Sequence, residues 1–177
     1  MINQSLHKTV GDLLKEFAEK NKQNGFKERL DPACGGEQYI SLFFDPSIKA
    51  LETRLCCVDA MLLKNDKIAA IIEIEESDIK PTQICGKYLT TALSKAYSHT
   101  KTNEHIIMEE HSIDFIQILD ISSPHKKKQA ENIEKAIRSN LCGCVKKYDV
   151  ICINWEEEGD SDKLEAELYK ILNEHRG

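Results

Sequence analysis

The sequence contains no apolar run that approaches the roughly 20 residues needed to cross a bilayer. Its first residues also lack the basic and apolar segments of a secretory signal. The seven cysteines are odd in number and are not spaced as a disulfide framework. We therefore expect a cytoplasmic protein with no membrane partner. In that compartment Cys56, Cys57, Cys85 and Cys152, which lie in apolar segments, should be reduced core residues.

Two further absences bear on the class of function. No glycine-rich phosphate loop follows the first predicted strand. A small-molecule α/β binding domain is therefore the least favoured of the function classes that we consider. The chain also has no excess of basic charge, because 24 basic and 30 acidic residues give a net charge of -6. This argues mildly against a nucleic-acid binder, since affinity for DNA comes largely from Lys and Arg. The distribution of charge matters more than its sum, however, and bases cluster at residues 126–128 and 146–147.

The chain of 177 residues is long enough for one domain with a sizeable core. Hydrophobic residues make up 41% and charged residues 31%, as in ordinary soluble globular proteins. No internal repeat or low-complexity segment divides the sequence. We therefore predict a single domain over residues 1–177.

Hydrophobic spacing predicts the element order α-β-β-β-α-β-α-β-α. Apolar residues at helical spacing begin at Leu6, and Asn24-Gly25 ends this first helix. Strands are expected at residues 39–44, 53–63, 67–75, 113–119 and 148–155, and further helices at 81–97, 126–141 and from about 160 onward. This order predicts a layered α/β fold with a mixed sheet. The successive strands should pair antiparallel, and the later β-α-β steps should pair parallel.

Acidic residues end two apolar runs in the middle of the chain. Asp59 ends the first run, a polar turn over residues 64–67 follows, and the second run ends in Glu73-Ile74-Glu75. Residues i and i+2 of a strand face the same side, so Glu73 and Glu75 should point together, with Ile74 opposite in the core. If both runs form one hairpin, Asp59 lies across from this pair. We therefore expect three carboxylates at one end of a sheet.

Carboxylates gathered in this way suit a hard cation such as Mg²⁺, which prefers oxygen ligands and keeps several waters. Such a cation can polarise a phosphate, lower the pKa of a bound water and stabilise the leaving oxygen. The alternative is that Glu73 and Glu75 line an exposed face or end of a strand. The apolar run up to Ile72 disfavours it, because an unpaired acid in a buried strand is costly.

The element order and these acids resemble the PD-(D/E)xK nuclease superfamily, which includes many restriction endonucleases. Asp59 matches the first acid of its motif and Glu73 the second. The resemblance covers about residues 6–121. It implies a restriction endonuclease-like αβββαβ core with a mixed central sheet flanked by helices, followed here by a C-terminal αβα extension. It further implies a site that holds Mg²⁺ or Mn²⁺, DNA as the partner, and a possible homodimer.

The sequence departs from this motif at one position, because Glu75 stands where the superfamily has Lys. Glu75 would then be a metal ligand, or a general base if neighbouring acids raise its pKa. Lys80 or Lys87 could supply the positive charge instead. Many members also draw an acid from the first helix or near the first strand, and the candidates here are Glu16, Glu19 and Glu37.

Two functional hypotheses follow. The first is a Mg²⁺- or Mn²⁺-dependent DNA endonuclease, in which Asp59, Glu73 and Glu75 bind metal and Lys80 or Lys87 contacts phosphate or water. The second is a catalytically degenerate protein of the same fold with a binding or regulatory role. The missing Lys and the acidic net charge motivate the second hypothesis.

Overall fold

A computed structural model describes residues 4–47, 51–76, 79–99, 104–155, 157 and 159–176. Its helices are α1 (Leu6–Lys20), α2 (Pro81–Leu93), α3 (Pro124–Arg138) and α4 (Asp160–Asn173). One sheet contains β1 (Phe26–Leu30), β4 (Ala60–Lys64), β5 (Lys67–Glu75), β8 (Ile113–Asp120) and β9 (Val145–Ile153), in the order β1-β4-β5-β8-β9. The other contains β2 (Ile40–Phe43), β3 (Arg54–Val58), β6 (Ala96–His99) and β7 (Glu104–Ile107), in the order β3-β2-β6-β7.

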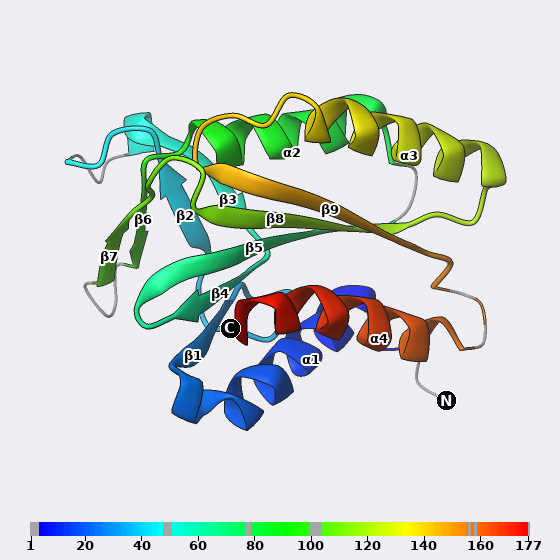
Figure 1. Cartoon of the computed structure of the whole chain (residues 1–177), viewed down its shortest axis with the longest axis horizontal. Helices are drawn as coiled ribbons and strands as arrows, with labels where there is room; N and C mark the ends of the chain where they lie inside the picture. The colour runs from blue at the N-terminus through cyan, green and yellow to red at the C-terminus, as the bar shows by residue number, and fades with distance from the viewer. Residues whose placement is uncertain are drawn as a thin grey trace.

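The larger sheet is mixed and has helices on both faces. Strands β1, β4 and β5 pair antiparallel, whereas β5, β8 and β9 pair parallel. Helices α2 and α3 lie over one face, and α1 and α4 lie over the other (Figure 1). The smaller sheet lies beside one end of this three-layered body (Figure 1). The α/β class, the mixed sheet and the parallel pairing of the later strands are thus as the sequence predicts.

The hairpin between β4 and β5 positions the acidic residues. Its turn contains Asn65 and Asp66, which both have positive φ, at 51° and 61°. Asn and Asp tolerate this conformation better than most residues, and it suits the tight turns that join twisted strands. The pairing that follows sets Ala60 opposite Ile72. Asp59 therefore comes next to the acidic end of β5.

Burial of β5 on both faces explains its continuous apolar run. Ile72 and Ile74 pack in a core with α1 and α4, while Ile71 packs in the core on the α2 and α3 side. The parallel neighbour β8 is buried in the same way, with Phe115 and Ile116 fully enclosed. An acid on such a strand cannot face water without a change in the packing.

The predicted elements differ from the structure at four places that affect the two sheets, and the polar character of an edge strand explains the first. The first strand of the larger sheet is β1, which we did not predict, because this edge strand has polar middle residues, with Lys27 exposed and Glu28 half-buried. The predicted strand at residues 39–44 is β2, in the smaller sheet. The predicted strand at 53–63 bends at Asp59 into β3 and β4, which belong to different sheets. The predicted helix at 81–97 ends at Leu93, and β6 and β7 follow it.

The cysteines only partly follow expectation. Cys57 and Cys85 are exposed, so the prediction that they are core residues is wrong. Cys56 and Cys152 are partly buried. All seven cysteines are free thiols. In the described part of the chain, no helix is long and apolar enough to cross a bilayer.

Candidate functional site

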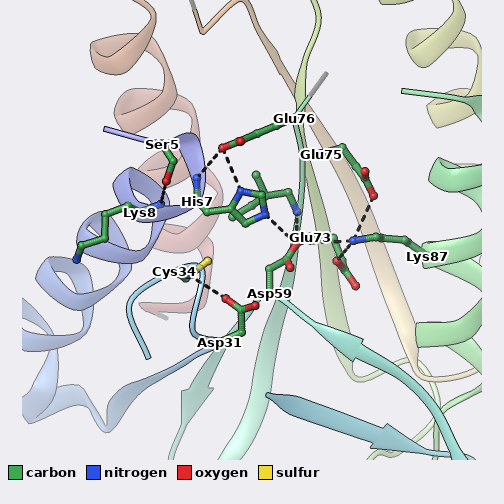
Figure 2. Close-up of polar contacts among 11 residues, drawn as sticks. Ser5, His7, Lys8, Asp31, Cys34, Asp59, Glu73, Glu75, Glu76 and Lys87 are labelled. Atoms are coloured by element: carbon green, nitrogen blue, oxygen red, sulfur yellow. Dashed lines mark hydrogen bonds and ion pairs between the residues drawn. The ribbon is translucent and has the colours of Figure 1, made fainter. Parts of the chain in front are cut away.

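The acidic cluster is built around Asp59, which lies at the bend between β3 and β4. Its Oδ2 accepts a hydrogen bond of 2.7 Å from the backbone N–H of Ile74 on β5. Figure 2 shows the Asp59 side chain beside the end of this strand, close to Glu73. The predicted convergence of Asp59 with the acids of β5 is therefore found in the structure.

Glu73 and Glu75 point to the side of β5 that α2 covers. Both carboxylates reach the same lysine, Lys87, while Ile74 between them packs in the opposite core. Glu73 is only 1% exposed and the Glu75 side chain is 12% exposed. The alternative in which these acids line an exposed strand face is therefore wrong. The buried Glu73 and the half-buried Glu75 are costly as charges on one strand face unless a cation lies close by.

Lys87 on α2 provides that cation. Its Nζ lies 2.6 Å from Glu73 Oε2, 3.2 Å from Glu75 Oε1 and 3.8 Å from Asp59 Oδ2. Figure 2 shows the ammonium group between the acids. The sequence left Lys80 and Lys87 as alternatives, and the structure brings only Lys87 to the cluster.

Lys80 has a different place. It is exposed and precedes the first turn of α2, where its backbone N–H donates a 2.9 Å hydrogen bond to Gln83 Oε1. Among the described residues, its side chain forms no ion pair with Asp59, Glu73 or Glu75. A charge at this position therefore does not neutralise the cluster directly.

Burial and charge act in opposite ways on the two main partners. Burial raises the pKa of Glu73 well above its ordinary value, the negative charge of Asp59 raises it further, and Lys87 opposes both effects. Burial lowers the pKa of Lys87, but the negative charges of Glu73 and Asp59 outweigh it, and the net pKa is raised. Lys87 therefore stays protonated, and Glu73 holds a proton to a higher pH than an exposed glutamate does.

One carboxylate oxygen of Glu75 accepts no hydrogen bond among the described residues. This atom, Oε1, is hidden from solvent. The 3.2 Å contact with Lys87 Nζ is thus an ion pair without hydrogen-bond alignment. A buried carboxylate oxygen without a hydrogen bond is costly, and such an atom in a native structure calls for an explanation.

The first helix contributes a histidine that sequence reasoning missed. His7 Nδ1 lies 3.0 Å from Glu76 Oε1, and the backbone N–H of His7 donates to the same oxygen at 3.2 Å. Its Nε2 lies 3.9 Å from Asp59 Oδ2. Burial raises the pKa of Glu76, but the hydrogen bonds from His7 outweigh it and lower the net pKa. Because His7 and Glu76 lie far apart in the sequence, no local pattern could have paired them.

The acids proposed for the first helix or strand lie elsewhere. Glu16 and Glu19 form ion pairs with nearby lysines on the exposed side of the chain. Glu37 lines a separate hollow of about 440 Å³, together with Lys15 and Arg29. Among these elements, it is His7 on α1 that approaches Asp59.

The loop that contains Asp31 and Cys34 packs against α1 and holds the backbone of Asp59 in place. The backbone N–H of Asp31 donates to the Asp59 carbonyl at 2.9 Å, and the Asp31 carboxylate accepts from the Cys34 N–H at 2.9 Å. This loop approaches α1 at Gly11, where an added Cβ would lie 2.0 Å from the Cys34 carbonyl oxygen. Only glycine allows the helix and the loop to come so close.

We therefore expect Gly11→Ala to lower the free energy of unfolding by about 1–3 kcal/mol, the usual cost of overpacking. Gly86→Ala is the matched control, because a Cβ at that position of α2 would meet nothing within 4 Å. It should raise the free energy of unfolding by about 0.5–1 kcal/mol through helix propensity. Urea titration of both variants tests this pair, and equal effects of the same sign would refute the close approach at Gly11.

The carboxylate oxygens of the cluster are the kind of ligand that a hard cation prefers, but the protein offers few of them. Among the described residues, no group of three or more His, Cys, Asp and Glu side chains is arranged to hold a metal. Mg²⁺ is often bound through only one or two carboxylates, with waters and substrate phosphates completing its shell. Asp59 and Glu73 fit that mode. The Lys87 ammonium already stands as a cation among the acids, and the orphaned Glu75 oxygen offers a further acceptor.

Comparison of the chain with protein-family models, with curated proteins and with solved structures found no match. The function therefore has to be inferred from the carboxylates, Lys87 and their surroundings.

Proposed function

We propose that this protein is a metal-dependent nuclease that hydrolyses phosphodiester bonds of DNA. The observation that carries the proposal is the cluster in which Asp59 and the buried Glu73 converge at the end of β5 with the Lys87 ammonium between them. A buried acid beside a half-buried one, with one lysine between them, is a costly arrangement for a fold to maintain. Groups with shifted pKa values in such clusters are concentrated at functional sites.

The arrangement of elements supports a restriction endonuclease-like core. When the smaller-sheet strands β2, β3, β6 and β7 are left aside, α1, β1, β4, β5, α2 and β8 follow in the αβββαβ order, and all four of these strands lie in the larger sheet. This succession uses β1 in place of the strand predicted at residues 39–44. Helix α3, strand β9 and helix α4 then form the αβα extension.

Each residue of the cluster has a role in this proposal. Asp59 and Glu73 would hold Mg²⁺ or Mn²⁺, with Glu75 as a further ligand or as a base. The bound cation supplies Lewis acidity toward the phosphate and lowers the pKa of a water molecule. Lys87 supplies the positive charge that the superfamily motif takes from its lysine, but from α2 instead of β5. In that position it would contact the phosphate or orient the attacking water.

Location and assembly are part of the same proposal. Seven free thiols suit a reducing compartment, which supports a cytoplasmic location. A homodimer would place two sites on one duplex and allow both strands to be cut.

The second candidate is a catalytically degenerate scaffold that binds or regulates without cleaving. One observation favours it, namely that Lys87 already neutralises part of the acidic charge that a metal would need. A scaffold of this kind would use the ion pairs only to join α2 to β5, and it would bind no divalent cation.

Cleavage assays separate the two candidates. Plasmid and single-stranded DNA are incubated with the wild type, Asp59→Ala and Glu73→Ala, each with Mg²⁺, Mn²⁺ or EDTA. We expect cleavage that requires metal and is lost in both variants. Metal-dependent cleavage that persists in both variants would place the active site elsewhere. Absence of cleavage together with absence of Mn²⁺ binding would favour the degenerate scaffold.

A further inference from the structure

We propose that Lys87 is an internal counter-cation that competes with the metal for Asp59, Glu73 and Glu75. Binding of a divalent cation would expel the Lys87 ammonium from the carboxylates and turn it toward the substrate phosphate. This inference rests on the nuclease proposal and adds to it a coupling between metal and substrate at the same site.

The positions of the atoms make the ammonium and a metal mutually exclusive. Lys87 Nζ lies within 4 Å of all three carboxylates, and its contact with Glu73 Oε2 is 2.6 Å. A Mg²⁺ ion would need these same oxygens at roughly 2.0–2.1 Å. Two cations that share one carboxylate oxygen repel each other strongly in a partly buried site. The lysine and the metal therefore cannot both hold Glu73 in the geometry seen here.

Lys87 is the partner that can move. Glu73 is fixed in the buried strand β5 with 1% exposure, whereas the Lys87 side chain is 33% exposed. A lysine has a flexible four-carbon stem, so its ammonium can swing outward without a shift of the helix.

The displaced Lys87 ammonium would lie beside the bound cation and would have lost its carboxylate partners. A phosphodiester is the anion that the proposed function brings to this place. Metal binding would therefore raise the affinity for phosphate, and phosphate would raise the affinity for metal by the same factor, as linkage requires. In the absence of either, the ion pairs keep the cluster neutralised in part.

A purely structural ion pair makes the opposite prediction for variants. If Lys87 only joins α2 to β5, its loss should disturb the acids and leave cation affinity unchanged or weaker. If Lys87 competes with the metal, its loss should strengthen cation binding. The sign of the change in affinity therefore separates the two roles.

The first test is calorimetric titration of Mn²⁺ into the wild type, Lys87→Gln, Lys87→Met and the control Lys80→Gln. We expect both Lys87 variants to bind Mn²⁺ about tenfold more tightly, the factor for removal of one charge-assisted hydrogen bond that the metal must break. Lys80→Gln removes the same charge from the same region and should bind as the wild type does. Unchanged or weaker binding in the Lys87 variants would overturn the competition.

The same titration distinguishes failure of the Lys87 competition from failure of the proposed function. No Mn²⁺ binding by the wild type or by either Lys87 variant would overturn the metal site itself. Wild-type binding that neither variant strengthens would overturn only the displacement of Lys87. Binding seen in the variants alone would show that Lys87 excludes the metal, and it would overturn the displacement of Lys87 by metal.

The second test uses the unaltered protein, so it does not depend on how the variants fold. Lysines are acetylated briefly with and without Mn²⁺, and the modification of each lysine is measured by mass spectrometry. Mn²⁺ should increase the modification of Lys87 severalfold, because its ammonium leaves the carboxylates, and should leave Lys80 unchanged. Equal or lower modification of Lys87 with Mn²⁺ bound would overturn the proposal.

Discussion

The Lys87→Gln variant is expected to cleave DNA about 10²–10³-fold more slowly than the wild type, the usual effect of removing one group that stabilises charge in the transition state. The reason is geometric, since Lys87 is the cation that the structure brings to Asp59, Glu73 and Glu75. The measurement is the initial rate of plasmid nicking at saturating Mn²⁺. Saturation is required so that altered metal affinity does not enter the rate.

A second substitution provides the control for this prediction. Glu75 occupies the position at which the superfamily motif has lysine, and its Oε1 lies 3.2 Å from Lys87 Nζ. Adding Glu75→Lys to Lys87→Gln returns an ammonium group to nearly the same place from β5. We expect the double variant to recover about tenfold or more of the lost rate. A full rate in Lys87→Gln would contradict the role of this charge, and no recovery in the double variant would show that the Glu75 carboxylate is itself required.

The Glu73→Gln variant is expected to be more stable than the wild type at pH 8, although it should lose metal binding. The pKa of Glu73 is raised in the folded protein, so the folded state holds its proton more tightly than the unfolded state does. The stability that this group contributes is present below its ordinary pKa and is lost as pH rises through the raised pKa. Glutamine cannot ionise and avoids this loss, which amounts to about 1.4 kcal/mol for each tenfold difference in proton affinity between the folded and unfolded states.

Urea unfolding in EDTA at pH 5 and pH 8 measures this effect. The stability of Glu73→Gln relative to the wild type should increase between the two pH values. Glu110→Gln is the control, because the Glu110 side chain is 77% exposed, and its difference from the wild type should not change with pH. If the stability of Glu73→Gln relative to the wild type instead decreases between pH 5 and pH 8, the effect of Lys87 on the Glu73 pKa outweighs the effect of burial. The expected result is a gain of stability at the expense of function.

The convergence of the acids could be predicted because it depends on local rules. The alternation of side chains along a strand places Glu73 and Glu75 on one side, and the turn at Asn65-Asp66 returns the chain toward Asp59. The structure contains both features. The continuous apolar run of β5 likewise predicts a central buried strand.

Features that depend on contacts between distant segments could not be predicted in the same way. Strand β1 was not predicted because an edge strand with the polar residues Lys27 and Glu28 in its middle lacks a clear apolar pattern. The choice between Lys80 and Lys87 depends on how α2 is rotated over the sheet, which its sequence does not fix. His7 comes from α1, and only the packed fold brings it to Asp59.

Direct measurement of Mn²⁺ binding tests the central claim most directly, because it requires no knowledge of the DNA sequence that is cut. The electron paramagnetic resonance signal of free Mn²⁺ is recorded during titration of the wild type, Asp59→Asn, Glu73→Gln and the control Glu110→Gln. We expect the wild type and the control to bind Mn²⁺, and the other two variants to bind about tenfold more weakly or not at all, since each loses one carboxylate ligand. Equal binding by all four proteins would show that Asp59 and Glu73 do not form a metal site.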